Sequence, residues 1–373
     1  MIYLDNAATS FPKPKCVYKA VDRCIRNYCG NPGRSSHRLS IKSAEKIFSA
    51  RESVSGFLGC KYPENVVFTY NATYALNLAI KGIINSDCHI ITSFYEHNSV
   101  IRPLAALKKK YNISISKFEN TDNPEIEIEN LIRSDTKAII CSVASNVTGD
   151  QVDLSILSKI ARKYDVCLIV DGSQAVGHKK FDLSVTPCDV FCAPGHKSLF
   201  GIQGCGFAVF KDKTRRNCIV EGGSGLESEN TEMPLLLPEG YEPGTLGTPS
   251  IVALESGINY INQVGIEEIE KHLTFLLNEL YIRLSSVKDI EIYKFGNGIL
   301  SFNISNIDSQ LVSSMLDRVG ICTRAGLHCA PDIHRRLGTI YQGAVRISLS
   351  HFNSLKDIDR LWHEIKCIRD NLI

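Results

Sequence analysis

The sequence has little net charge and lacks any long hydrophobic run. Its 373 residues carry 42 Lys and Arg against 40 Asp and Glu, so the formal net charge at pH 7 is +2. Charge alone therefore gives no reason to expect a nucleic-acid or membrane partner. No apolar stretch approaches the ~20 residues that span a bilayer. The first residues, MIYLDNAATS, contain Asp5 and lack the basic-then-apolar order of a signal peptide, so we expect a cytoplasmic protein.

Several motifs of cofactor and metal chemistry are also missing. The sequence has no paired C-x-x-C motif, and we expect its 14 cysteines to be free thiols in a reducing compartment. Cys188 and Cys192 lie two strand repeats apart, which favours core packing over a metal site. A G-x-x-x-x-G-K-[ST] phosphate loop is excluded because His196 separates Gly195 from Lys197. No G-x-G-x-x-G turn follows the early predicted strands, so no dinucleotide cofactor is predicted. The cysteine pattern likewise gives no reason to predict a metal site.

Short apolar strands alternate with helices over much of the chain. Strands are predicted at residues 66–70, 89–94, 113–118, 137–144, 166–172, 189–193 and 204–210, and helices at 73–84, 98–111 and 154–164. This alternation predicts an α/β fold with a mostly parallel seven-stranded sheet, covered by helices on both faces. We assign it to a large domain, residues 16–249. Ligands bind such sheets at the carboxyl ends of the strands.

The pattern changes after about residue 240. Residues 237–250, LPEGYEPGTLGTPS, are rich in proline and glycine, which is typical of a linker. The elements predicted after it are a long helix over 251–285, strands at 290–295, 298–304 and 344–350, and helices near 308–318 and 355–370. We therefore expect a smaller α+β C-terminal domain, residues 250–373, joined by an N-terminal arm, residues 1–15. Two domains also suit a chain of this length.

One lysine stands where an ammonium group is hard to accommodate. Lys197, in GHKSLFG (195–201), lies in a glycine-bracketed turn between two predicted strands. A confined, partly desolvated lysine loses proton affinity and becomes a nucleophile toward carbonyl compounds. Pyridoxal 5'-phosphate (PLP) is an aldehyde cofactor that joins such a lysine as a Schiff base and needs an acid beside its ring nitrogen. Asp171, at the end of the strand 166–172, suits that role.

Other polar groups at predicted strand ends suit the same cofactor. Thr73, after Ala72, opens a helix and offers a hydroxyl, backbone N–H groups and the positive end of the helix dipole to a phosphate. His97 can stack on a flat ring, and Gln174 can donate a hydrogen bond to the phenolic oxygen. Asn146 follows the strand 137–144. All lie on the edge of the sheet where ligands bind.

Eight segments resemble, in order, those of one family. They are LDNAAT (4–9), YNATYALNL (70–78), YEHNSV (95–100), SNVTG (145–149), DGSQAVGH (171–178), GHKSLFGIQGCG (195–206), EPGTLGTPS (242–250) and RAGLHCAP (324–331). The sequence resembles the class V aminotransferase group, whose members have the PLP-dependent transferase fold type I. Within that group it resembles the cysteine desulfurase and selenocysteine lyase family, from residue 3 to the C-terminal helix.

The resemblance implies a role for each polar residue. Lys197 would carry PLP, with His97 stacked on the ring, Asp171 at the ring nitrogen and Gln174 at the phenolic oxygen. The full set of implied cofactor-binding residues is Ala72, Thr73, His97, Asn146, Asp171, Gln174, His196, Lys197 and Thr245. Thr245 would reach the phosphate from the second subunit of a homodimer. Asn146, Arg324 and Arg346 would bind substrate, although Arg346 could instead be paired structurally with an acid.

The resemblance also implies the reaction. Lys197, His97 and Cys329 would be the catalytic residues of a cysteine desulfurase that converts L-cysteine to L-alanine. Cys329 follows His328 and lies near Arg324, and positive neighbours favour the thiolate. Cys329 would receive the sulfur as a persulfide, and the compact loop 324–331 resembles the branch that needs a sulfur-acceptor protein. L-selenocysteine is an alternative substrate.

Three departures from the family's motifs leave alternatives open. Pro194 stands where many relatives carry a phosphate-binding serine or threonine, Tyr74 stands where an acid is common, and Asn98 follows His97 in place of a second histidine. The alternatives are a selenocysteine lyase, a cysteine sulfinate desulfinase, or another PLP enzyme of the class V aminotransferase fold, such as a transaminase or epimerase. A non-catalytic scaffold is a further alternative, which the retained Lys197 and Asp171 disfavour.

Overall fold

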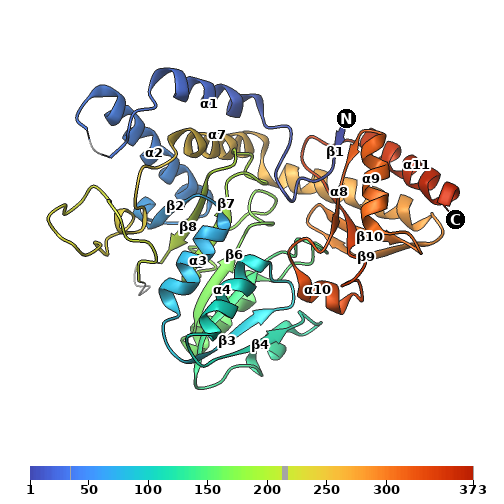
Figure 1. Ribbon diagram of the computed structural model, residues 1–373, viewed down its shortest axis with the longest axis horizontal. Coiled ribbons are helices and arrows are strands. Elements are labelled where there is room, and N and C mark those ends of the chain that lie inside the picture. Colours follow the sequence, from blue (N-terminus) through green and yellow to red (C-terminus); the bar gives the residue numbers. More distant parts are fainter. Residues whose placement is uncertain (34, 212–216, 373) are drawn as a thin grey trace.

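The seven strands predicted between residues 66 and 210 form one sheet. In the computed structural model, which describes residues 1–33, 35–211 and 217–372, their order is β2-β8-β7-β6-β5-β3-β4 (Figure 1). The strands are β2 (Val66–Thr69), β3 (Cys88–Ser93), β4 (Ile113–Phe118), β5 (Thr136–Ser142), β6 (Cys167–Asp171), β7 (Val190–Pro194) and β8 (Gly206–Phe210). Among these described strands, β8 alone runs opposite to the other six. The predicted α/β fold is confirmed.

The sheet is buried on both faces, which explains its continuous apolar strands. Successive residues of β3 belong to different cores, because strand side chains alternate between faces. Ile90 packs in the core that contains Leu76 and Leu104, and Ile91 packs in the core that contains Leu157 and Leu254. The helices behind these contacts are α3 (Ala72–Ile83), α4 (Asn98–Lys108), α6 (Leu154–Tyr164) and α7 (Thr248–Val264). Helices therefore cover both faces of the sheet.

Two predicted helix boundaries were wrong. The helix expected over 251–285 is two helices, α7 and α8 (Ile266–Ser285), which are separated by Gly265. Gly265 has φ +91°, a backbone conformation that glycine adopts most readily, and it interrupts the helical backbone. The helix expected over 98–111 ends at Lys108, and three turn-type bonds close it at residues 109–111. The helices that were not predicted are α1 (Lys15–Asn27), α2 (Arg38–Phe57), α5 (Pro124–Glu129) and α10 (Pro331–Arg336).

The C-terminal part forms an antiparallel sheet backed by helices. Its strands are β9 (Ile290–Gly296), β10 (Ile299–Ile304), β12 (Arg324–Gly326) and β13 (Ala344–Ser348), in the order β12-β13-β10-β9. Its helices include α8, α9 (Ser309–Arg318) and α11 (Leu355–Leu372). The first strand, β1 (Ile2–Tyr3), pairs with β11 (Ile321–Cys322), so both chain ends lie beside this part (Figure 1). A smaller α+β part is thus confirmed, while the domain boundaries 16–249 and 250–373 stay predictions.

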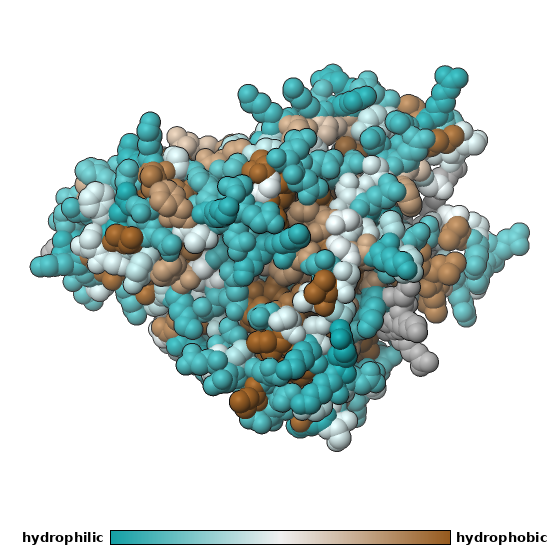
Figure 2. All heavy atoms as spheres, turned by 180° about the vertical axis from the view of Figure 1, so that it is seen from behind, coloured by the Kyte–Doolittle hydropathy of each residue, from teal (hydrophilic) through white to brown (hydrophobic). Residues whose placement is uncertain are grey.

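One face of the molecule is mostly hydrophilic (Figure 2). Seen from behind, hydrophilic side chains cover much of the molecule, and hydrophobic ones gather toward the middle of that face (Figure 2). None of the helices in the described residues is long and apolar enough to cross a bilayer.

Candidate active site

A cavity of about 250 Å³ opens at the carboxyl ends of the parallel strands. It collects groups from β5, β6 and β7, from the starts of α3 and α4, and from the C-terminal sheet. The predicted site residues that line it are Ala72, Thr73, His97, Asn146, Asp171, Gln174, His196, Lys197, Arg324, Cys329 and Arg346. Residues more than 270 positions apart in sequence therefore meet in one place.

Lys197 lies in the tight turn between β7 and β8. The Phe200 backbone N–H donates to the Lys197 carbonyl at 2.9 Å, which closes the turn. The preceding carbonyl, of His196, accepts from the Ser10 N–H at 3.0 Å and from the Lys13 Nζ at 2.9 Å. The N-terminal arm therefore holds the peptide group in front of the lysine.

The electrostatics around Lys197 favour its neutral amine. Burial lowers the pKa of Lys197 to about 8, and Arg346 and Arg324 act in the same direction, while Asp171 opposes the shift. A lysine with this pKa is about one-tenth neutral amine at pH 7, far more than an ordinary lysine, and the neutral amine is the nucleophile. The sequence predicted that Lys197 is confined and partly desolvated, and the burial that lowers its pKa agrees with this.

Two buried carboxylates belong to this region: Asp171 lines the cavity, and Glu96 is hydrogen-bonded to Ser142, which lines it. Asp171, at the end of β6, is buried and accepts from the Ser173 backbone N–H at 2.9 Å. Glu96 is also buried, and its carboxyl accepts from the hydroxyls of Ser93 at 2.5 Å and Ser142 at 2.9 Å. Burial raises the pKa of Glu96 to about 7, the hydrogen bonds oppose the shift, and Asp171 adds to it.

The start of α3 is brought to the cavity by a close approach of β8. A Cβ on Gly206 would lie 2.5 Å from the Asn71 carbonyl carbon and 2.8 Å from the Ala72 nitrogen. Only glycine leaves room for this approach. Asn71 caps the helix by accepting from the Tyr74 N–H at 2.9 Å, and Thr73 lies in the first turn. The first backbone N–H groups of α3 therefore face the cavity with the positive end of its dipole.

A hydroxyl chain joins this helix to His97. The Thr73 Oγ1 lies 2.7 Å from the Ser99 Oγ, which lies 2.8 Å from the His97 Nδ1. The Ser99 backbone N–H also donates to Nδ1 at 3.0 Å, so the proton of the neutral ring is on Nε2. Burial lowers the pKa of His97 to about 4, and Lys197 adds to the shift. His97 is thus a neutral, oriented imidazole at the start of α4.

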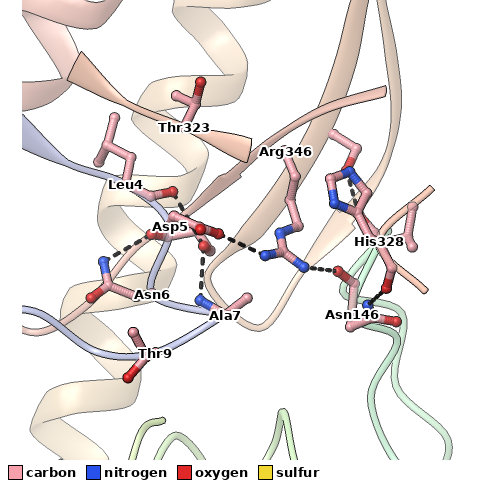
Figure 3. Close-up of polar contacts among 12 residues, drawn as sticks. Leu4, Asp5, Asn6, Ala7, Thr9, Asn146, Thr323, His328 and Arg346 are labelled. Carbon is pink, nitrogen blue, oxygen red and sulfur yellow. Dashed lines mark hydrogen bonds and ion pairs between the residues drawn. The ribbon is translucent and has the colours of Figure 1, made fainter. Parts of the chain in front are cut away.

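Arg346 on β13 is buried at the far wall and is paired with an acid from the N-terminal arm. Its Nη2 donates to the Asp5 Oδ1 at 2.7 Å, and its Nη1 donates to the Asn146 carbonyl at 3.0 Å (Figure 3). Among the described residues, its Nε–H and the Asn146 Oδ1 have no partner although both are buried. The sequence left open whether Arg346 is paired with an acid or lines a pocket. In the structure it is paired with Asp5 and also lines the cavity.

Arg324 lies opposite Arg346 in the antiparallel register of β12 and β13. Like charges opposite one another destabilise a sheet unless an anion lies between them. Asp5 supplies one negative charge to Arg346, and within the described residues Arg324 forms no ion pair. The two arginines therefore leave positive charge at the cavity wall that a second carboxylate can balance.

Cys329 is exposed on a short, tightly held loop at the cavity rim. His328 and Cys329 both have positive φ, +48° and +58°, a strained pair for residues with side chains. The Asn146 Nδ2 donates to the His328 carbonyl at 2.7 Å, and the Asn98 N–H donates to the Cys329 carbonyl at 2.7 Å. Contacts with the large sheet's loops thus hold the backbone that carries the thiol.

Thr245 lies outside the cavity of its own chain. Its Oγ1 accepts from the Asn31 Nδ2 at 3.4 Å, and it borders a separate pocket with Tyr70 and Tyr74. A contribution from a second copy therefore stays a prediction. Pro194, which lacks the usual hydroxyl, does line the cavity.

Sequence reasoning missed Ser99 and Glu96. Both lie beside His97 in the segment YEHNSV, and the signal was available. Ser99 carries a hydroxyl in the first turn of the helix after His97, and Glu96 is an acid two residues after the predicted strand 89–94. Their roles depend on contacts with Thr73 and Ser142, which only the fold brings near.

Comparison with known proteins defines the class. The Aminotransferase class-V family model matches residues 2–361. The chain therefore belongs to this family, and the resemblance seen in the sequence is confirmed.

Its relatives define the branch within the family. The chain is 30% identical to a "Probable cysteine desulfurase" of Methanothermobacter thermautotrophicus, covering 96% of this chain and 92% of that protein. It is 32% identical to a protein of the same name from Borreliella burgdorferi, covering 96% and 89%. The structure of an apo cysteine desulfurase from Thermococcus onnurineus superposes with a TM-score of 0.92 at 28% identity, covering 100% of this chain and 95% of that one. The cysteine desulfurases are thus the family members that this chain resembles.

Proposed function

We propose that this chain is a PLP-dependent cysteine desulfurase, which transfers the sulfur of L-cysteine to Cys329 and releases L-alanine. The observation that carries the proposal is one cavity that joins a half-buried lysine, Lys197, to a buried carboxylate, Asp171, and an exposed thiol, Cys329. Relatives named cysteine desulfurase, similar over nearly the whole chain, support the same activity.

The donor set fits PLP. Lys197 would hold the aldehyde, Asp171 the ring nitrogen, and Gln174 the phenolic oxygen. The Gln174 Nε2 donates to the Ala7 carbonyl at 3.1 Å, and its second N–H remains available by valence. His97 would cover the ring. When bound, PLP supplies an electron sink for the substrate's amino carbon.

The phosphate would lie at the start of α3, against Ala72 and Thr73. The buried Nδ1 of His196, which has no partner among the described residues, is a further candidate donor. Ser99 would supply the hydroxyl that Pro194 lacks, because its Oγ lies 2.7 Å from the Thr73 Oγ1. Two hydroxyls on α3 and α4 would then hold the phosphate in place of one on the lysine turn.

The substrate carboxylate would bind Arg346 and Arg324. The unpartnered Nε–H of Arg346 and the excess positive charge support this position. Asn146, whose buried Oδ1 lacks a partner among the described residues, would orient the substrate beside the ring. Asp5 holds the Arg346 fork in place.

The sulfur step conserves atoms and electrons. The Cys329 thiolate attacks the sulfur of the bound cysteine and forms an S–S bond, while the substrate's C–S bond breaks with its electron pair on carbon. That carbon takes a proton, which gives alanine and a persulfide on Cys329. Lys197 and His97 would move protons, since each has a lowered pKa, about 8 and about 4, and each lines the cavity.

A homodimer belongs to the proposal, with Thr245 of a second copy completing the phosphate site. Large apolar side chains are exposed on α1, α2 and the segment 217–247, as expected of a surface that a partner covers. They include Tyr18, Ile25, Leu39, Ile41, Phe48, Leu235 and Leu236. The proposed location is the cytoplasm, where a cysteine nucleophile stays reduced.

The test replaces Cys329 with serine and uses Cys16→Ser as a matched control, because both thiols are exposed. Alanine and sulfide are measured from L-cysteine with a thiol reductant. We expect a loss of at least about a hundred-fold in the Cys329→Ser variant and no change in the control. Sulfide release at the parent rate without Cys329 would refute the persulfide role.

Two further measurements separate the alternatives. Parallel reactions with L-selenocysteine and cysteine sulfinate test the selenocysteine lyase and desulfinase activities. Lys197→Ala should remove the visible absorption that the parent protein acquires with PLP. A parent protein that stays colourless with added PLP would favour a non-catalytic scaffold.

A further inference from the structure

A second depression continues from the active-site cavity onto the surface. This groove, of about 300 Å³, runs between α3 and α4 and is bordered by Asn77, Lys81, Asn98, Arg102, Ala106 and Cys329. Cys329 is exposed and lines both the cavity and the groove, so this residue lies where the two meet.

The groove is positively charged, and its two cationic side chains are not paired with acids among the described residues. Lys81 and Arg102 are exposed, and neither forms an ion pair with any of the described residues. Residues 72–86 and 97–118, which contain α3 and α4, include no Asp or Glu. The acid nearest in sequence to Cys329 is Asp332, and it is already paired with Lys117 at 2.5 Å and Arg335 at 2.6 Å.

This concentration of charge is notable because the whole chain has a net charge of only +2. A positive surface attracts negatively charged partners and raises their association rate. Because the groove ends at a thiol on a held loop, a partner bound there presents its own groups directly to the Cys329 sulfur.

We propose that the α3–α4 groove docks an acidic segment of a sulfur-acceptor protein whose accepting cysteine is flanked by carboxylates. The proposal rests on the function proposed above. The acceptor thiolate attacks the outer sulfur of the Cys329 persulfide, one S–S bond forms as another breaks, and Cys329 leaves as a thiolate. The exchange needs no external oxidant or reductant.

The test compares two synthetic peptides as acceptors, one with a cysteine between glutamates and one with a cysteine between glutamines. The full-length protein is loaded on Cys329 either with L-cysteine or directly with inorganic polysulfide, and the Cys329→Ser variant serves as the blank. At low salt we expect the glutamate peptide to accept sulfur about five-fold faster, because Lys81 and Arg102 line the groove and attract its carboxylates. The advantage should fall as salt screens the charges.

A charge reversal locates the effect. Arg102→Glu should remove the advantage of the glutamate peptide, and Arg102→Lys should keep it. Lys356→Glu, an equal change of charge at an exposed residue of α11, should leave it unchanged. Alanine released in the first turnover should be the same in all three variants.

The outcomes separate the two proposals. Equal rates for both peptides at low salt, or an Arg102→Glu variant that behaves like the parent, would overturn the docking site. Failure to release alanine from L-cysteine would overturn the proposed function alone, since polysulfide loading tests the groove without turnover.

Discussion

Replacing Glu96 with glutamine should change how stability depends on pH. Burial raises the pKa of Glu96 from 4.5 to about 7. The folded state therefore holds a proton that the unfolded chain has lost, and stability falls as pH rises from about 4.5 to about 7. A raised pKa of this size costs about 3 kcal/mol above about pH 7, at ~1.4 kcal/mol for each pH unit.

Glutamine resembles the neutral form of Glu96 in shape and can make similar hydrogen bonds. Its amide oxygen can accept from the Ser142 backbone N–H, which lies 3.0 Å from the Glu96 Oε1. Its N–H₂ group can donate to the Ser142 hydroxyl, which lies 2.9 Å from Oε2. The variant should therefore be nearly as stable as the parent at about pH 5 and more stable by up to about 3 kcal/mol at about pH 8.

The assay is urea denaturation at several pH values, on protein without added cofactor. Taking the difference between variant and parent cancels the titration of all other groups. Glu64→Gln, an exposed glutamate in the short helix before β2, is the control and should show no pH-dependent difference. A variant-minus-parent difference that is constant from about pH 5 to about pH 8 would refute the raised pKa and the neutral Glu96.

Three other substitutions test the site. Ser99→Ala should weaken PLP binding about ten-fold, the effect of one lost hydrogen bond to a charged group, measured by titration of visible absorption; unchanged binding would exclude Ser99 from the phosphate site. Arg346→Lys should raise the KM for L-cysteine by about ten-fold or more, because the two-pronged guanidinium is replaced by a single ammonium group. Steady-state kinetics measures this, and an unchanged KM would place the substrate carboxylate elsewhere. Gly206→Ala should destabilise the protein by about 1–3 kcal/mol, because its new Cβ would lie 2.5 Å from the Asn71 backbone; thermal denaturation at the parent temperature would contradict this close approach.

The strands and most of the site were predictable for the same physical reason. Strands buried on both faces are continuous apolar runs, so their ends are visible in the sequence, as at Asp171. Parallel strands also bring their carboxyl ends to one edge. Eleven of the twelve predicted site residues line one cavity, and Thr245 does not. Three of the eleven, Arg324, Cys329 and Arg346, were implied by the family resemblance and reach the cavity from the C-terminal part.

Other features depend on contacts that no local pattern encodes. Asp5 and Arg346 are 341 positions apart, and the arm that carries Asp5 also holds the turn before Lys197. The hydroxyl chain through Ser99 joins two helices, and the raised pKa of Glu96 arises because the packed sheet excludes water from it.

The sequence by itself determined the fold class and the alternation of elements, because burial and turn chemistry leave repeating local patterns, and its motifs indicated the family. Only the tertiary structure decided which polar groups meet, which are paired and which remain without a partner, and that Cys329 joins a cavity to a positively charged groove. Those properties depend on distances across the fold and on exclusion of water, and both arise only when the chain has closed on itself.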